Sequence, residues 1–166
     1  LVKGAYWDSE ITYAQVSGFD DYSVFTRKPL TDLSWMACAI KLIKYQKNIF
    51  PAFATHNAYS IAFIEEMARG CRFEFQRIHG MADILHNYFN KNSNLEKSKC
   101  RIYAPVGDYE DLLPYLMRRL LENGANTSFV NKLNDKNFKV EEFVIDPIDI
   151  IKKYNEYGNP YIPKPK

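Results

Sequence analysis

The chain has 166 residues, of which 46% are hydrophobic and 25% charged, a composition typical of one globular domain with a sizeable core. A net charge of +2 gives no electrostatic basis for nucleic-acid binding, and no apolar run approaches the length of a membrane span. The three cysteines are isolated and odd in number, which indicates reduced thiols in a cytosolic compartment. The histidines lack metal-ligand spacing, so no metal site is expected.

Apolar and aromatic runs that alternate with amphipathic stretches predict four strand–helix units. The strands are expected at residues 1–7, 48–54, 73–78 and 100–106, and the helices at 31–46, 57–70, 82–90 and 108–124, with a polar connection over 8–30. This alternation indicates an α/β fold with a parallel sheet. An open doubly wound sheet and half of a barrel both fit, since a complete barrel needs roughly 250 residues.

Polar and aromatic residues follow the ends of the predicted strands. They are Tyr6 and Trp7, then Thr55, His56 and Asn57, then Gln76 to His79, and finally Tyr103. Parallel strands bring their carboxyl ends to one rim, where ligands bind in such folds. The sequence therefore predicts a binding site at this rim.

Residues 115–124 are typical of the end of an amphipathic helix, with Gly124 expected to terminate it. One face holds Tyr115, Arg118, Arg119 and Glu122, and the other holds Leu112, Leu113, Leu116, Met117, Leu120 and Leu121. The polar face has two interpretations. It is either a solvated surface with an Arg118–Glu122 ion pair, or a clamp in which two guanidinium groups hold one small carboxylate.

Six segments in order carry a resemblance to a known family: residues 1–8, 26–28, 53–57, 75–81, 103–107 and 115–131. Through them the chain resembles the flavin-dependent proline dehydrogenase domain of the bacterial bifunctional proline-utilisation (PutA) family. The resemblance implies the second half, strands five to eight, of a distorted (β/α)8 TIM-type barrel with a final helix over the strand ends. That half would occupy residues 1–134, and residues 135–166 would be an extended tail toward an absent aldehyde-dehydrogenase domain.

The resemblance also implies a reaction: FAD-dependent oxidation of L-proline to 1-pyrroline-5-carboxylate, with hydride transfer to flavin N5 and electrons passing to a membrane quinone. The expected location is cytoplasmic, with a peripheral position at the inner face of the bacterial membrane as an option.

Site residues follow from the same resemblance. Arg118 and Arg119 would hold the proline carboxylate, and the proline ring would lie among Tyr103, Tyr115, Tyr6 and Ala5. Cofactor contacts are implied for Val2, Lys3, Gly4, Trp7, Thr26, Thr55, His56, Asn57, Gln76, Arg77, Ile78, Glu122 and Phe129. His79 and His86 are expected to pack or cap rather than to act.

The family's first four strands, with its active-site lysine and aspartate, have no counterpart in this sequence, which starts inside a predicted strand. We therefore expect the chain alone neither to bind FAD stoichiometrically nor to oxidise proline, and its partner to be the other half of the barrel. Two alternatives remain at this stage. One is a non-catalytic remnant of a truncated or split gene, and the other is a related flavin barrel enzyme such as a methylenetetrahydrofolate reductase.

Overall fold

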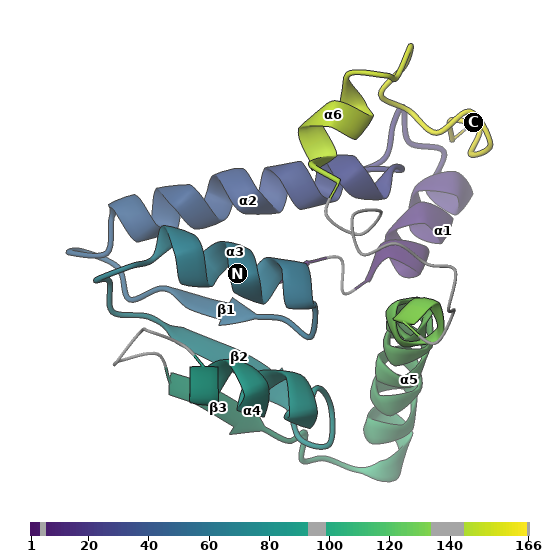
Figure 1. The fold of residues 1–166 in the computed structure, drawn as a ribbon. Coiled ribbons are helices and arrows are strands. Elements are labelled where there is room, and N and C mark those ends of the chain that lie inside the picture. Colours follow the sequence, from purple (N-terminus) through teal and green to yellow (C-terminus); the bar gives the residue numbers. More distant parts are fainter. Residues whose placement is uncertain (4–5, 93–98, 134–144, 166) are drawn as a thin grey trace. The chain divides into compact units, whose positions relative to one another are not determined.

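A computed structural model describes residues 1–3, 6–92, 99–133 and 145–165, with side chains in the long fifth helix described as far as Leu121. Its elements are α1 (Trp7–Ser17), α2 (Lys28–Lys44), β1 (Ala52–Ala54), α3 (Ala58–Met67), β2 (Glu74–Ile78), α4 (Asp83–Asn92), β3 (Lys99–Tyr103), α5 (Tyr109–Leu133) and α6 (Pro147–Ile151) (Figure 1). The backbone divides into two compact units, residues 1–49 with 145–166 and residues 50–144. The predicted α/β class is confirmed.

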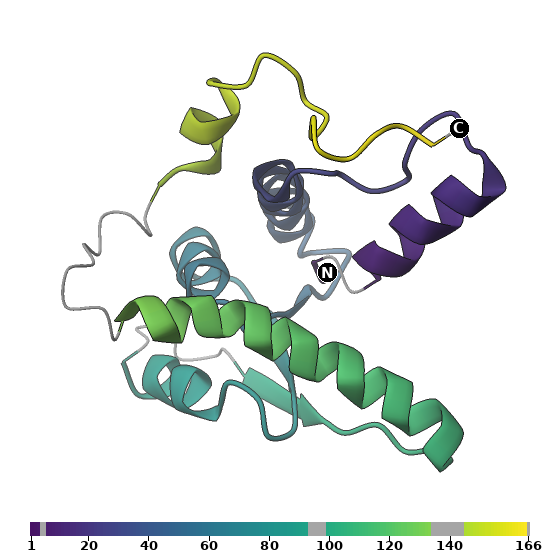
Figure 2. The same ribbon diagram turned by 90° about the vertical axis from the view of Figure 1, so that its right-hand side faces the viewer.

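The second unit is built on a parallel sheet with the strand order β1-β2-β3. Phe53 lies opposite Phe75 in this sheet, and both side chains are at most 2% exposed. The ring of Phe73 meets each of them edge-on, at centroid distances of 5.9 and 5.2 Å. Figure 2 shows α3 and α4 together on one side of the sheet, so a single face carries the aromatic core.

The helices of this unit begin where the sequence offers a suitable end. Asn57 caps α3 by accepting a hydrogen bond from the backbone N–H of Ser60 at 3.0 Å. Before α4 the backbone passes through two left-handed residues, Gly80 at φ 80° and Ala82 at φ 56°. Glycine adopts this conformation freely, but alanine does so with strain, so the turn into α4 is held by its surroundings.

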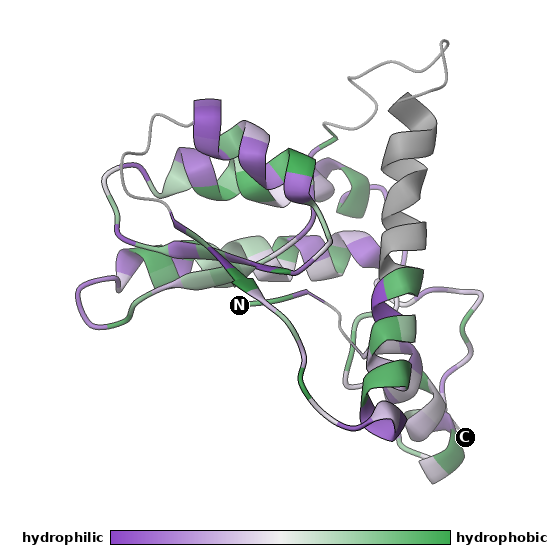
Figure 3. Ribbon diagram, turned by 90° about the horizontal axis from the view of Figure 1, so that it is seen from below, coloured by the Kyte–Doolittle hydropathy of each residue, from purple (hydrophilic) through white to green (hydrophobic). Residues whose placement is uncertain are grey.

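Helix α5 lies beyond the carboxyl ends of the strands, to their right in Figure 1 and across the front in Figure 2. It runs to Leu133, so the prediction that Gly124 ends it is wrong. A glycine costs a helix interior only about 1 kcal/mol, which favourable neighbours can offset. On its apolar side, Leu113, Leu116 and Leu120 are 43%, 43% and 62% exposed. Figure 3 shows hydrophobic and hydrophilic residues mixed along its described turns.

The first unit departs most from the sequence-based expectation. Leu1–Lys3 has no regular structure, and helix α1 occupies part of the stretch predicted as a polar connection, so the predicted strand at residues 1–7 is wrong. A strand forms by pairing within a sheet, and the sheet of the described residues consists of β1, β2 and β3. Asp8 and Glu10 instead suit the first turn of a helix.

The carboxyl-terminal segment belongs to this same unit. Helix α6 packs against α2, and the backbone N–H of Asn159 donates to Thr26 Oγ1 at 2.9 Å. The guanidinium of Arg27 stacks on the ring of Tyr154 at 4.0 Å and donates from Nε to the Gly158 carbonyl at 2.7 Å. The expected boundary near residue 134 lies outside the described residues, and the described part of the tail is a packed segment with one helical turn.

Candidate functional site

The turn between β1 and α3 collects Thr55, His56 and Asn57 at the carboxyl end of the sheet. Thr55 Oγ1 accepts a hydrogen bond from the N–H of Asn57 at 3.1 Å, which shapes the turn. His56 Nε2 accepts from the N–H of Ile78 at 3.3 Å, which ties the turn to the end of β2. Three of the predicted site residues are thus held at the predicted rim.

The ends of β2 and β3 lie beside this turn. The N–H of Thr55 donates to the Gln76 carbonyl at 3.2 Å, and the N–H of His79 donates to the Tyr103 carbonyl at 2.8 Å. Ile78 and Tyr103 are register partners in the parallel ladder. The sheet therefore brings the expected rim residues of the second unit together.

Arg77 is expected to line a cofactor, and its guanidinium is engaged inside the protein. It is 6% exposed, donates from Nη1 to the Met81 carbonyl at 3.2 Å and pairs through Nη2 with Asp83 at 2.5 Å. These two contacts close the turn that leads into α4. In this structure the Arg77 guanidinium stabilises the start of α4.

Sequence reasoning missed a polar cluster on the sheet face opposite α3 and α4. Arg101 donates to both carboxylate oxygens of Glu74, at 2.9 and 2.8 Å, and Gln76 Nε2 donates to Glu74 Oε1 at 2.7 Å. The hydrogen bonds from Arg101 and Gln76 lower the pKa of Glu74 to about 2. Polar residues at alternate positions of a buried parallel strand were the available signal, because such strands are usually apolar throughout.

The arginine face of α5 is the more buried side of its described part. Tyr115, Arg118 and Arg119 are half-buried, and the Nε atoms of both arginines are shielded from solvent. The Arg119 guanidinium lies 5.6 Å from the centre of the Tyr115 ring. A burial pattern in which leucines are more exposed than arginines does not fit a merely solvated face. The side chain of Glu122 lies outside the described residues, and so does the expected Arg118–Glu122 ion pair.

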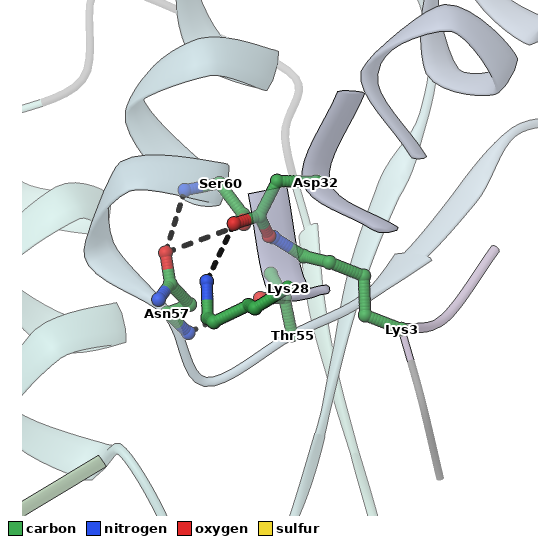
Figure 4. A network of polar contacts seen from close by, with 6 residues as sticks. All are labelled: Lys3, Lys28, Asp32, Thr55, Asn57 and Ser60. Atoms are coloured by element: carbon green, nitrogen blue, oxygen red, sulfur yellow. Dashed lines mark hydrogen bonds and ion pairs between the residues drawn. The ribbon is translucent and has the colours of Figure 1, made fainter. Parts of the chain in front are cut away.

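The first unit holds the remaining expected residues. Lys3 Nζ contacts Asp32 Oδ1 at 2.9 Å and lies 4.9 Å from the Trp35 ring, and Lys28 Nζ contacts Asp32 Oδ2 at 2.5 Å (Figure 4). Burial lowers the pKa of Lys3. Burial alone would raise the pKa of Asp32, but hydrogen bonds from the two lysines outweigh it and lower that pKa. Lys3 is thus fixed by a carboxylate that the sequence reasoning did not single out.

Other expected residues of this unit are anchored or exposed. Trp7 Nε1 donates to the Phe25 carbonyl at 2.9 Å, while Val2 and Tyr6 are 56% and 53% exposed. The hydroxyl and carbonyl of Thr26 both accept from Asn159. Gly4, Ala5 and the side chain of Phe129 lie outside the described residues.

A family model described as proline dehydrogenase matches residues 1–132 of the chain. The chain belongs to the proline dehydrogenase family. This membership favours proline dehydrogenases over the methylenetetrahydrofolate reductases.

Named relatives agree with this membership. The bifunctional protein PutA of Salmonella typhimurium is 48% identical over 174 aligned residues, covering 100% of this chain and 13% of the relative. Proline dehydrogenase 1 of Bacillus subtilis is 33% identical, covering 80% of this chain and 39% of the relative. A solved structure described as proline utilization A with proline bound in remote sites matches at a TM-score of 0.84 and 50% identity, over 98% of this chain and 16% of that one. The chain thus spans about an eighth of the PutA relatives that it matches.

Proline dehydrogenases of this family use a flavin, and the rim offers groups that fit the pyrophosphate of FAD. Helix α3 presents its amino terminus there, where the helix dipole favours an anion. The Thr55 hydroxyl accepts from Asn57 and keeps its own proton for donation. Asn57 Oδ1 accepts from Ser60, which leaves the amide N–H₂ group as a donor. The chemistry of this donor set suits a dinucleotide phosphate.

The described part of the chain lacks two features. No group of histidine, cysteine, aspartate or glutamate residues there could hold a metal ion. No helix among the same residues is both long and apolar enough to cross a membrane.

Proposed function

We propose that this chain is the part of a flavin-dependent proline dehydrogenase that binds the substrate carboxylate and one side of the cofactor. The reaction would oxidise L-proline to 1-pyrroline-5-carboxylate. The observation that carries the proposal is the half-buried arginine pair on α5, beside the carboxyl ends of three parallel strands. Two guanidinium groups with shielded Nε atoms suit a small carboxylate better than they suit water.

We propose that the chain forms half of a (β/α)8 barrel. Three features support this: strands that follow chain order, parallel pairing throughout, and helices α3 and α4 on one face. A doubly wound sheet would carry helices on both faces. The opposite face carries Glu74, Gln76 and Arg101, which would line the barrel interior. The other half of the barrel would be the partner that covers the edges of β1 and β3.

In this proposal the chain's residues bind and orient the substrate. Arg118 and Arg119 hold the proline carboxylate by charge-assisted hydrogen bonds, and this fixes the ring relative to the rim. Tyr103 and Tyr115 would form apolar walls that exclude water from the ring, and the family resemblance assigns Tyr6 and Ala5 to the same substrate. FAD, when bound, supplies the chemistry of hydride acceptance at N5 and of electron transfer to a quinone.

The cofactor would be held by the β1–α3 turn together with residues that the family resemblance assigns. Thr55, His56 and Asn57 would meet the pyrophosphate and ribitol, and Gln76 and Ile78 would lie along the ring system. A quinone acceptor is a membrane lipid, so we propose a cytoplasmic protein that works at the inner face of the membrane.

The arginine assignment is tested by Arg118→Met and Arg119→Met, made in the Salmonella typhimurium protein after its aligned segment is replaced by this chain. Each change should raise the KM for proline by about 100-fold or more, because a charged hydrogen-bonding partner of the carboxylate is lost. FAD content, measured from visible absorbance, should stay nearly intact. Steady-state kinetics give the KM.

Arg69→Met is the matched control, since Arg69 forms a surface ion pair with Glu66 at 2.5 Å. It should leave the KM unchanged. Loss of flavin from the Arg118 and Arg119 variants with an unaltered KM for proline would refute the clamp.

A second prediction concerns the chain alone. Purified without the rest of the barrel, it should hold no stoichiometric FAD and oxidise no proline, because much of the cofactor surface would come from the other half. A flavin absorption band that bleaches on addition of proline would contradict this. The remaining alternative is a non-catalytic remnant, and in that case the chain should also fail to restore activity in the Salmonella typhimurium protein.

A further inference from the structure

A buried histidine lies behind the turn that carries the candidate pyrophosphate-binding residues. His86 comes from α4 and is 2% exposed, and its ring meets Phe75 edge-on at a centroid distance of 5.8 Å. Its Nε2 lies 3.0 Å from the Thr55 carbonyl oxygen, and its Nδ1 lies 3.5 Å from Cys100 Sγ. One imidazole therefore connects α4, β3 and the β1–α3 turn.

These partners fix the protonation of the ring. A carbonyl oxygen only accepts, so Nε2 must carry the proton. In the neutral ring Nδ1 is then an acceptor, and the Cys100 thiol donates to it. Burial lowers the pKa of His86 and raises the pKa of Cys100, so both groups stay neutral near pH 7. The charged and titratable groups nearby are Arg77, Asp83 and His56, of which Arg77 and His56 also oppose protonation of His86 while Asp83 favours it.

The helix that carries His86 is itself held in place. Its first residue, Asp83, pairs with the buried Arg77, which also binds the Met81 carbonyl. The backbone N–H of His86 donates to the carbonyl of Ala82, the residue held at φ 56°. Strain of this kind persists only where neighbours impose it. The imidazole thus projects from a fixed helix start.

We infer that His86 is a positioning residue for the flavin site: its Nε2–H holds the Thr55 carbonyl and so sets the orientation of the Thr55–Asn57 turn. His56 secures the same turn from the next residue through Ile78. The turn is then fixed at two consecutive positions. This inference rests on the proposed function for one point, the assignment of FAD binding to the Thr55–Asn57 turn.

The test compares two amides that differ in reach, His86→Gln and His86→Asn, in the Salmonella typhimurium protein that carries this chain in place of its aligned segment. The N–H₂ group of glutamine lies near the position of the histidine Nε2. The amide of asparagine is one methylene shorter and lies near the position of Nδ1, too far from the Thr55 carbonyl to donate to it. The FAD dissociation constant should stay within about 3-fold for His86→Gln and rise by about 10-fold for His86→Asn, which leaves the Thr55 carbonyl unsatisfied. Lys91→Gln and Lys91→Asn are the matched controls at an exposed position of the same helix, and neither should change the FAD dissociation constant.

Equal FAD affinities for the two His86 variants would overturn the inference. A second measurement is independent of flavin and of variant folding. A long-range ¹H–¹⁵N spectrum of the histidine-labelled protein should show His86 protonated at Nε2 and bare at Nδ1, and a proton at Nδ1 would overturn the inference. Absence of flavin from the wild-type protein would instead refute the proposed function, while the spectrum still decides the role of His86 in the turn.

Discussion

Glu74 shows how one carboxylate on the sheet can carry pH-dependent stability. Its pKa lies near 2 because Arg101 and Gln76 donate hydrogen bonds to the ionised form. In the unfolded chain the pKa returns to about 4.5. Between pH 4.5 and 2 the folded state therefore binds fewer protons than the unfolded chain. The stabilisation that ionised Glu74 gives to the folded state is complete above pH 4.5 and is lost as the pH falls toward 2.

Glu74→Gln should remove this pH dependence. At pH 7 it should lower the free energy of unfolding by about 1 kcal/mol, a modest value because Arg101 is largely exposed to solvent. Between pH 4.5 and 2 the wild-type and variant stabilities should converge. Chemical denaturation of the chain at pH 7, 4.5 and 3 measures this, with Glu66→Gln as the surface control. Parallel pH profiles for wild type and Glu74→Gln would contradict the assignment.

The sequence predicted individual polar residues at the rim, but it could not predict their partners. Thr55, His56 and Asn57 follow a strand, and this position alone identifies them as rim residues. The Glu74–Arg101 pair depends on the register between β2 and β3, which leaves no local trace in the sequence. The contact of His86 with Thr55 spans 31 residues and depends on how α4 packs on the sheet.

At the scale of elements, the strands and helices from α2 to α5 follow hydrophobic periodicity and helix caps, and they occur where the sequence predicts them. The two errors have physical causes. Residues 1–7 have strand-like composition, but the described sheet is made of β1, β2 and β3 alone. Gly124 weakens α5 without ending it, because a single glycine costs less than continued helix hydrogen bonding provides.

The turn into α4 offers a test of backbone strain. Ala82→Gly should raise the free energy of unfolding by about 0.5–1 kcal/mol, because glycine adopts a φ of 56° without a Cβ clash. Ala37→Gly is the control, since Ala37 is exposed within α2 and the same substitution there should lower stability by about 1 kcal/mol. Thermal unfolding of both variants measures the difference. A loss of stability in both would show that Ala82 is not strained.

At the scale of the whole molecule, this α/β chain of the proline dehydrogenase family matches the family model over residues 1–132, and residues 145–165 pack in its first unit. The half-buried arginine face of α5 and the exposed leucines around it indicate a helix that needs further protein around it. The polar sheet face with Glu74 and Arg101 supports the same conclusion, because such a face suits an interior that further protein completes. Both features agree with the proposal that the chain is half of a barrel.

The visible absorption spectrum of the Salmonella typhimurium protein carrying this chain in place of its aligned segment tests that account most directly. The account predicts a bound flavin band near one equivalent per chain, which bleaches when L-proline is added under anaerobic conditions. A folded protein without flavin, or with a flavin that L-proline does not reduce, would contradict it.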